Sequence, residues 1–101
     1  MPTYKLSILT PDGNVYENDV ESLVAPGAGG YFGILAGHAN MIAATVPGVF
    51  KVSDPANKFF AVGTGVLEVL KDGSVNFLAD HAEEAKDEES AKSVAAKIAE
   101  H

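Results

Sequence analysis

The side chains best suited to chemistry are hydroxyls, histidines and one aspartate, scattered along the chain. The hydroxyl of Ser7 or Thr10 could act as a nucleophile. His38 or His81 could be its base, with Asp80 as the orienting acid. The sequence contains no G-x-S-x-G elbow, no phosphate loop with its lysine and no H-E-x-x-H pair, the patterns that fix such groups on defined elements. We therefore predict that the chain is not an enzyme.

A possible metal site is the run Asp80-His81 followed by Glu83 and Glu84. Carboxylates and imidazoles bind divalent cations, but adjacent side chains on a predicted helix point in different directions. A solvated acidic face accounts for the run more simply, and we predict neither a metal nor a cofactor. The sequence has no cysteine, which excludes thiolate zinc sites, disulfides and cysteine nucleophiles.

The charge of the chain argues against a nucleic-acid partner. The net charge is −7 over 101 residues, and there is no arginine. Guanidinium groups and basic patches dominate phosphate and guanine recognition, so this class of partner is excluded. Residues 80–101 hold seven acidic side chains against three lysines. This acidic tail could meet basic surfaces of a partner, although an ordinary solvated face explains it equally well.

The first 79 residues read as a series of short strands separated by turns. Tyr4, Leu6 and Ile8 alternate with polar residues, which predicts a half-buried strand. Residues 71–74, Lys-Asp-Gly-Ser, give the best hairpin signal. About eight or more strands favour a sandwich or flattened barrel. The remaining strands are expected at 15–17, 20–25, 41–46, 49–53, 58–62, 66–70 and 75–78.

Residues 30–39, Gly-Tyr-Phe-Gly-Ile-Leu-Ala-Gly-His-Ala, combine glycines with large apolar side chains in what we predict to be a loop. Phe32, Ile34 and Leu35 are costly to expose to water, whereas the glycines let the backbone bend. A loop of this composition indicates a surface that contacts another surface.

The amino-acid composition changes after Ala79, because no glycine or proline follows this residue. Apolar residues at 91, 94, 95 and 98 share one helical face, and Asp87 is the expected N-cap. So short a helix is marginal by itself and needs a surface to lie on. The alternative is a frayed acidic terminus. We predict a β-sandwich domain over residues 1–80 and a short helical tail over 81–101.

Several spaced motifs together resemble the epsilon subunit of bacterial F-type ATP synthases, called delta in mitochondria. The resemblance covers residues 4 to about 100. The motifs are Val20-Glu21-Ser22-Leu23 leading to Ala25-Pro26-Gly27, Gly30-x-Phe32-Gly33-Ile34-Leu35-x-Gly37-His38-Ala39, Pro47-Gly48, Phe60-x-Val62-x-x-Gly65-Val66-Leu67-Glu68-Val69, and Val75-x-x-Leu78-Ala79-Asp80-x-Ala82-Glu83.

The resemblance implies a mainly β fold, a flattened antiparallel β-sandwich of about ten strands with a short C-terminal helical segment. It implies a non-catalytic rotor subunit of the central stalk that couples the gamma subunit to the membrane c ring during ion-driven ATP synthesis. The protein would lie peripherally on the cytoplasmic side of the bacterial inner membrane. The acidic tail could also touch subunits of the catalytic head. A small β-barrel that binds an apolar ligand in its interior is the alternative function.

The resemblance also implies two contact sites. The c-ring loops are expected to meet Tyr31, Phe32 and His38. The gamma subunit is expected to meet Thr10, Met41, Ile42 and Glu68. Many relatives carry an acid where this chain has Tyr31, so a more apolar or hydrogen-bonding contact is expected there. Phe32 could instead anchor the segment in the core, and His38 could serve only its local turn. The apolar gamma-contact residues could likewise belong to the core, and alternation alone would expose Glu68.

The C-terminal part departs from relatives of ordinary length, which continue into a second helix. In some relatives the segment matching residues 87–92 carries an aspartate and an arginine for ATP. Asp87 matches the acid, but Ser90 stands in the place of the arginine. A triphosphate lacks a cation there, so we predict no nucleotide binding. The sequence stops after one helix, so we also expect little or no hairpin-type inhibition of ATP hydrolysis.

Overall fold

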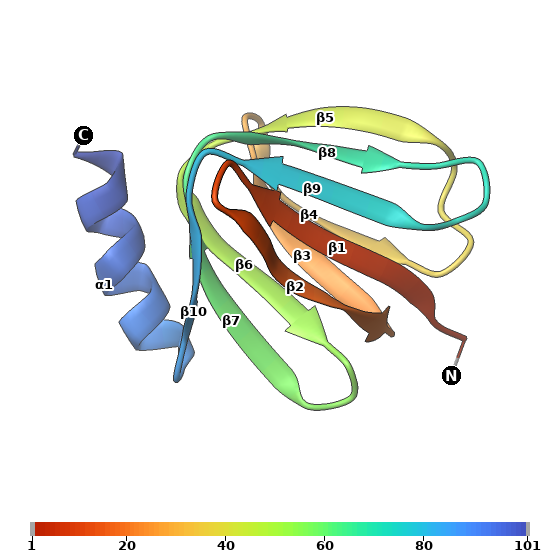
Figure 1. Ribbon diagram of the computed structural model, residues 1–101, viewed down its shortest axis with the longest axis horizontal. Coiled ribbons are helices and arrows are strands. Elements are labelled where there is room, and N and C mark those ends of the chain that lie inside the picture. The colour runs from red at the N-terminus through yellow and green to blue at the C-terminus, as the bar shows by residue number, and fades with distance from the viewer. Residues whose placement is uncertain (1, 101) are drawn as a thin grey trace.

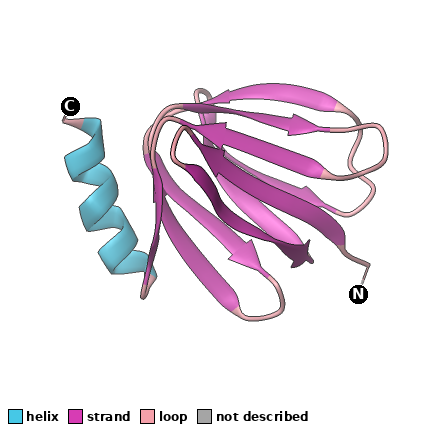
Figure 2. Ribbon diagram, in the orientation of Figure 1, coloured by secondary structure: helices cyan, strands magenta, loops and turns pink. Residues whose placement is uncertain are grey.

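Ten strands and one helix form the computed structural model, which describes residues 2–100 (Figure 1). The strands are β1 (Tyr4–Thr10), β2 (Gly13–Val20), β3 (Ser22–Gly27), β4 (Gly30–Leu35), β5 (Met41–Thr45), β6 (Gly48–Ser53), β7 (Asn57–Val62), β8 (Gly65–Val69), β9 (Val75–Ala79) and β10 (Ala82–Ala85), and the helix is α1 (Glu88–Ala99). Figure 2 shows that strands make up most of the chain and that the helix lies at one side of them.

The strands form one continuous sheet that folds over on itself. Their order is β10-β7-β6-β3-β5-β8-β9-β1-β2, with β4 paired to β3. Every pairing is antiparallel except β1 with β9, which is parallel. Strand β3 joins the two halves, because it pairs with β6 along its first residues and reaches β5 at Gly27. The predicted mainly β sandwich with a short C-terminal helix is confirmed.

Apolar side chains from both halves fill the interior. Tyr4, Leu6 and Ile8 are buried in alternation, as their spacing predicts. The rings of Phe50 and Phe77 stack across the two halves with centroids 4.6 Å apart. Aromatic pairs of this kind add to the burial of their area, and such close packing stiffens a domain. A filled core weighs against the alternative of a barrel that holds an apolar ligand inside.

The predicted loop over residues 30–39 is wrong for its first six residues. They form β4, which pairs antiparallel with β3 throughout its length. Phe32 and Ile34 face the core in alternation, whereas Tyr31 and Leu35 face outward. Gly33 does not interrupt the strand, because a Cβ at this position would make only ordinary contacts, the nearest at 3.5 Å. Pairing with β3 therefore overrides the local preference of glycine for a turn.

The tail also starts differently from the prediction. Residues Ala82–Ala85 pair with the edge of β7, so the sheet continues past residue 80 and α1 begins only at Glu88. Ala82 packs against the core. The acidic residues next to it in the sequence obscure this apolar position, so the sequence pattern does not predict the strand. The N-cap prediction is confirmed, since the Asp87 carboxylate accepts a hydrogen bond from the Ser90 amide at 2.7 Å. No helix within residues 2–100 is long and apolar enough to cross a membrane.

Candidate interaction surfaces

The outer face of β5, β8, β9 and β1 carries a row of apolar side chains. Ala44 lies opposite Val66, Val66 opposite Leu78, and Leu78 beside Leu9. We call these four residues the apolar row. Val66 is 44% exposed and Leu78 49% exposed, and on the same face of β5 Ile42 is 71% exposed. Large apolar groups gathered on an exposed sheet face are typical of a binding surface.

The sequence contains a signal for the apolar row that alternation alone misses. In strands with one solvent-exposed face, apolar and polar residues alternate. Val66-Leu67 and Phe77-Leu78 instead place two apolar residues in succession. In each pair one side chain is buried in the core and the other faces outward. Two successive apolar residues in a strand indicate that both faces of the strand are covered. The predicted gamma contacts nevertheless do not include Leu78 or Leu9.

The structure brings three of the predicted gamma contacts together. Met41, Ile42 and Glu68 line one shallow hollow beside the apolar row, and Ile42 lies directly opposite Glu68. Met41 is partly buried against the core. Thr10 lies at the end of β1, where its hydroxyl donates to the Gly13 carbonyl at 3.3 Å. Thr10 thus shapes a turn at the edge of the same sheet face.

The three predicted c-ring contacts do not form one loop. Tyr31 lies at the start of β4, is 59% exposed and accepts a hydrogen bond from the Val49 amide at 3.3 Å. Phe32 packs partly against the core. His38 follows the other end of β4, and its Nδ1 lies 2.7 Å from the Ala39 carbonyl. Strand β4 therefore separates Tyr31 from His38, and the ring of His38 also serves its own turn.

The residues considered for catalysis lie in two separate hollows. Thr10, Asp80 and His81 line one of them, where the Thr10 hydroxyl donates to the Gly13 carbonyl. Ser7 and Gly37, the neighbour of His38, line the other hollow together with the turn between β8 and β9. Asp80 and Thr10 lie at the opposite ends of β9 and β1, about 15 Å away along a five-residue strand. The Nε2 of His81 lies 3.3 Å from a carboxylate oxygen of Glu83. Within residues 2–100, no three side chains of the metal-binding types are grouped to hold an ion.

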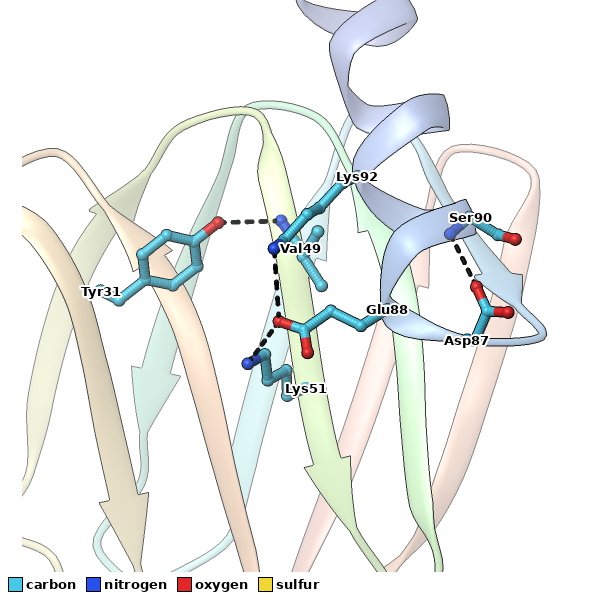
Figure 3. Close-up of polar contacts among 7 residues, drawn as sticks. All are labelled: Tyr31, Val49, Lys51, Asp87, Glu88, Ser90 and Lys92. Atoms are coloured by element: carbon cyan, nitrogen blue, oxygen red, sulfur yellow. Dashed lines mark hydrogen bonds and ion pairs between the residues drawn. The ribbon is translucent and has the colours of Figure 1, made fainter.

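The other half of the sandwich has its outer face covered by α1. Val49 and Ala61, opposite each other on β6 and β7, are buried outside the main core, as are Ala91 and Ala95 of the helix. We call these four residues the helix contact. At its edge the Nζ of Lys51 lies 2.6 Å from a Glu88 carboxylate oxygen (Figure 3). The hydrogen bond from Lys51 lowers the pKa of Glu88.

The fold and its two outer faces can be compared with known proteins. Residues 3–85 match the family model for the beta-sandwich domain of the ATP synthase delta/epsilon chain. The chain belongs to this family. Membership makes it an epsilon-type subunit without a catalytic role, as the sequence resemblance predicted.

Individual relatives agree with the family assignment. The epsilon subunit is similar to the ATP synthase epsilon chain of Helicobacter pylori strain G27, with 39% identity covering 99% of this chain and 85% of that one. The epsilon chain of Anoxybacillus flavithermus is 43% identical, with 96% and 72% covered.

Two solved assemblies share the fold. A chain of the Euglena gracilis mitochondrial ATP synthase, solved with OSCP, F1 and c-ring, superposes with a TM-score of 0.77 at 18% identity, covering 99% of this chain and 79% of that one. A chain of the Tetrahymena thermophila central stalk and c-ring gives 0.69 at 15% identity, covering 80% and 66%.

Proposed function

We propose that this epsilon subunit is a rotor component of the central stalk that binds the gamma subunit through the apolar row and the neighbouring hollow at Met41, Ile42 and Glu68. The single observation that carries the proposal is the apolar row, which crosses four strands on an exposed sheet face. Burying the half-exposed Val66 and Leu78 side chains would stabilise the contact by about 25 cal/mol per Å² of apolar area, which offsets part of the entropic cost of association.

The stiffness of the sandwich supports this role. A subunit that transmits rotation must pass force from one partner to another without deforming. The continuous sheet and the stacked Phe50 and Phe77 rings give a body with a densely packed interior. Through its proposed contacts with gamma and the c ring, the protein would be attached peripherally to the cytoplasmic side of the inner membrane.

The c-ring contact is proposed for the exposed side chains of β4 and the loop after it. Tyr31, Leu35 and His38 are exposed, whereas Phe32 holds the strand against the core. Because β4 spaces Tyr31 from His38, the contact would extend along the strand instead of centring on one loop. The proposed contact of the acidic tail with the catalytic head rests only on its charge.

A charge placed in the apolar row tests the gamma contact. Leu78→Lys would bury an ammonium group against the partner, which we expect to weaken binding to purified gamma by at least about tenfold. Asn57→Lys introduces the same charge at an exposed position at the start of β7 and is the matched control. Affinity is measured by titration calorimetry, after circular dichroism has shown that both variants are folded. Equal affinity of the two variants would remove the apolar row from the interface.

Cysteine crosslinking tests the c-ring contact separately, because the chain has no cysteine of its own. His38→Cys and Leu35→Cys should form adducts with cysteines in the polar loops of the c ring in the assembled complex. Asn57→Cys should form none. If neither β4-side variant reacts while the gamma contact holds, the c-ring proposal fails on its own.

A further inference from the structure

Tyr31 contacts the strand on which α1 rests. We propose that its hydroxyl couples the tip of the β3–β4 hairpin to the docked state of α1. The link runs through Val49, whose amide donates to Tyr31 and whose side chain belongs to the helix contact (Figure 3). This coupling is a property of the folded chain by itself and does not depend on the proposed gamma or c-ring contacts.

Tyr31 provides a hydrogen-bond acceptor to β6 at the point where the pairing of β3 with β6 ends. The β3–β6 pairing ends with Val24 opposite Lys51, and two residues further the same register would place Pro26 opposite Val49. Proline has no N–H to give. The Pro26 carbonyl accepts instead from the Val46 amide at 2.9 Å, as the chain turns toward β5. Pro26 therefore makes no backbone hydrogen bond to Val49, and the β3–β6 ladder ends before this residue.

Tyr31 replaces the missing acceptor. It lies directly opposite Pro26 in β4, and its hydroxyl accepts the Val49 N–H at 3.3 Å. Gly48 leaves the necessary room, because a Cβ there would lie 3.1 Å from the Tyr31 oxygen and 2.8 Å from the Pro26 Cβ. A backbone N–H in a poorly solvated position needs such a partner, since leaving it unpaired costs more than the bond itself gains.

The other side of Val49 supports the helix. The Val49 side chain is 3% exposed and faces outward with Lys51, whose Nζ pairs with Glu88 of α1. Only Ala91 and Ala95 of the twelve residues of α1 are fully buried, and Val94 and Ile98 are half-buried. A helix this short is stable only while it is docked, so small movements of the strand beneath it change its stability. Losing the Tyr31 bond therefore releases both the Val49 amide and α1.

Hydrogen exchange followed by NMR on the full chain tests this coupling. In Tyr31→Phe we expect the Val49 amide to exchange about fivefold faster, as befits one lost hydrogen bond, and the α1 amides to accelerate with it. The matched control is Tyr4→Phe, which removes a hydroxyl bonded to the Ile34 carbonyl of β4 at 2.8 Å but not to β6. In this control α1 exchange should stay at the wild-type rate.

The reverse direction uses the helix as the perturbed site. Ala95→Glu places a charge in the helix contact and should speed exchange at Val49, because coupling between two sites is reciprocal. In the double variant Tyr31→Phe/Ala95→Glu the two effects on Val49 should combine to less than their product. Multiplicative effects would overturn the coupling. So would unchanged α1 exchange in Tyr31→Phe, or acceleration spread equally over β8 and β9.

Discussion

Gly65 is the position at which the packing of the proposed gamma surface is tightest. A Cβ added there would lie 2.4 Å from the Leu78 carbonyl oxygen and 3.0 Å from the Ala79 Cα. Both obstacles are backbone atoms of β9, so no side-chain rotation can relieve the clash. Gly65→Ala must push β8 away from β9, the two central strands of the apolar row.

The expected loss follows from two opposing terms. Overpacking of this kind costs about 1–3 kcal/mol, and reduced freedom of the unfolded chain returns about 0.4–1 kcal/mol. We therefore expect the free energy of unfolding to fall by about 1–2 kcal/mol. For a domain of this size that corresponds to a melting temperature lower by roughly 4–15 °C.

Urea titration followed by circular dichroism measures the change, with Gly33→Ala as the control. Gly33 also lies in a strand, but its nearest Cβ contact would be 3.5 Å, so alanine should be neutral or slightly stabilising there. Gly65→Ala should also bind gamma more weakly at temperatures where it is folded. Equal stability of the two variants would refute the steric argument.

Three further predictions concern polar groups. Thr45→Val should raise the free energy of unfolding by about 1 kcal/mol, because its hydroxyl is buried and has no hydrogen-bond partner among residues 2–100; urea titration checks it. Tyr16→Phe should lose about 1–2 kcal/mol in the same assay by removing a 2.5 Å bond to the Asp54 carboxylate. The hydrogen bond from the Ser90 amide lowers the pKa of Asp87, and the hydrogen bond from Lys51 lowers the pKa of Glu88. Helix stability should therefore be constant above about pH 5 and should fall as the pH drops below the ordinary pKa values of these two groups, 3.8 and 4.5. Ellipticity at 222 nm against pH should lose the Asp87 part of this fall in Asp87→Asn, which keeps the cap.

The sequence predicts those elements whose signals are local. The alternation at Tyr4, Leu6 and Ile8, the hairpin at 71–74 and the N-cap at Asp87 each depend on residues within a few positions of one another. Strand β4 could not be found in this way, because its glycines favour a turn and only the pairing with β3 makes it extended. The apolar row depends on register across four strands, which short-range patterns do not determine.

The two outer faces of the sandwich explain why the contact surface lies where it does. On β6 and β7 the outward apolar side chains include Val49 and Ala61, which are buried under α1, and the half-buried Phe59. On β8 and β9 the equivalent positions hold Val66 and Leu78, and within the described chain no element covers them. Both faces break strict alternation, so composition alone cannot tell which one is free. The position of α1 decides this, and a partner that displaced α1 would expose a second apolar face at Val49 and Ala61.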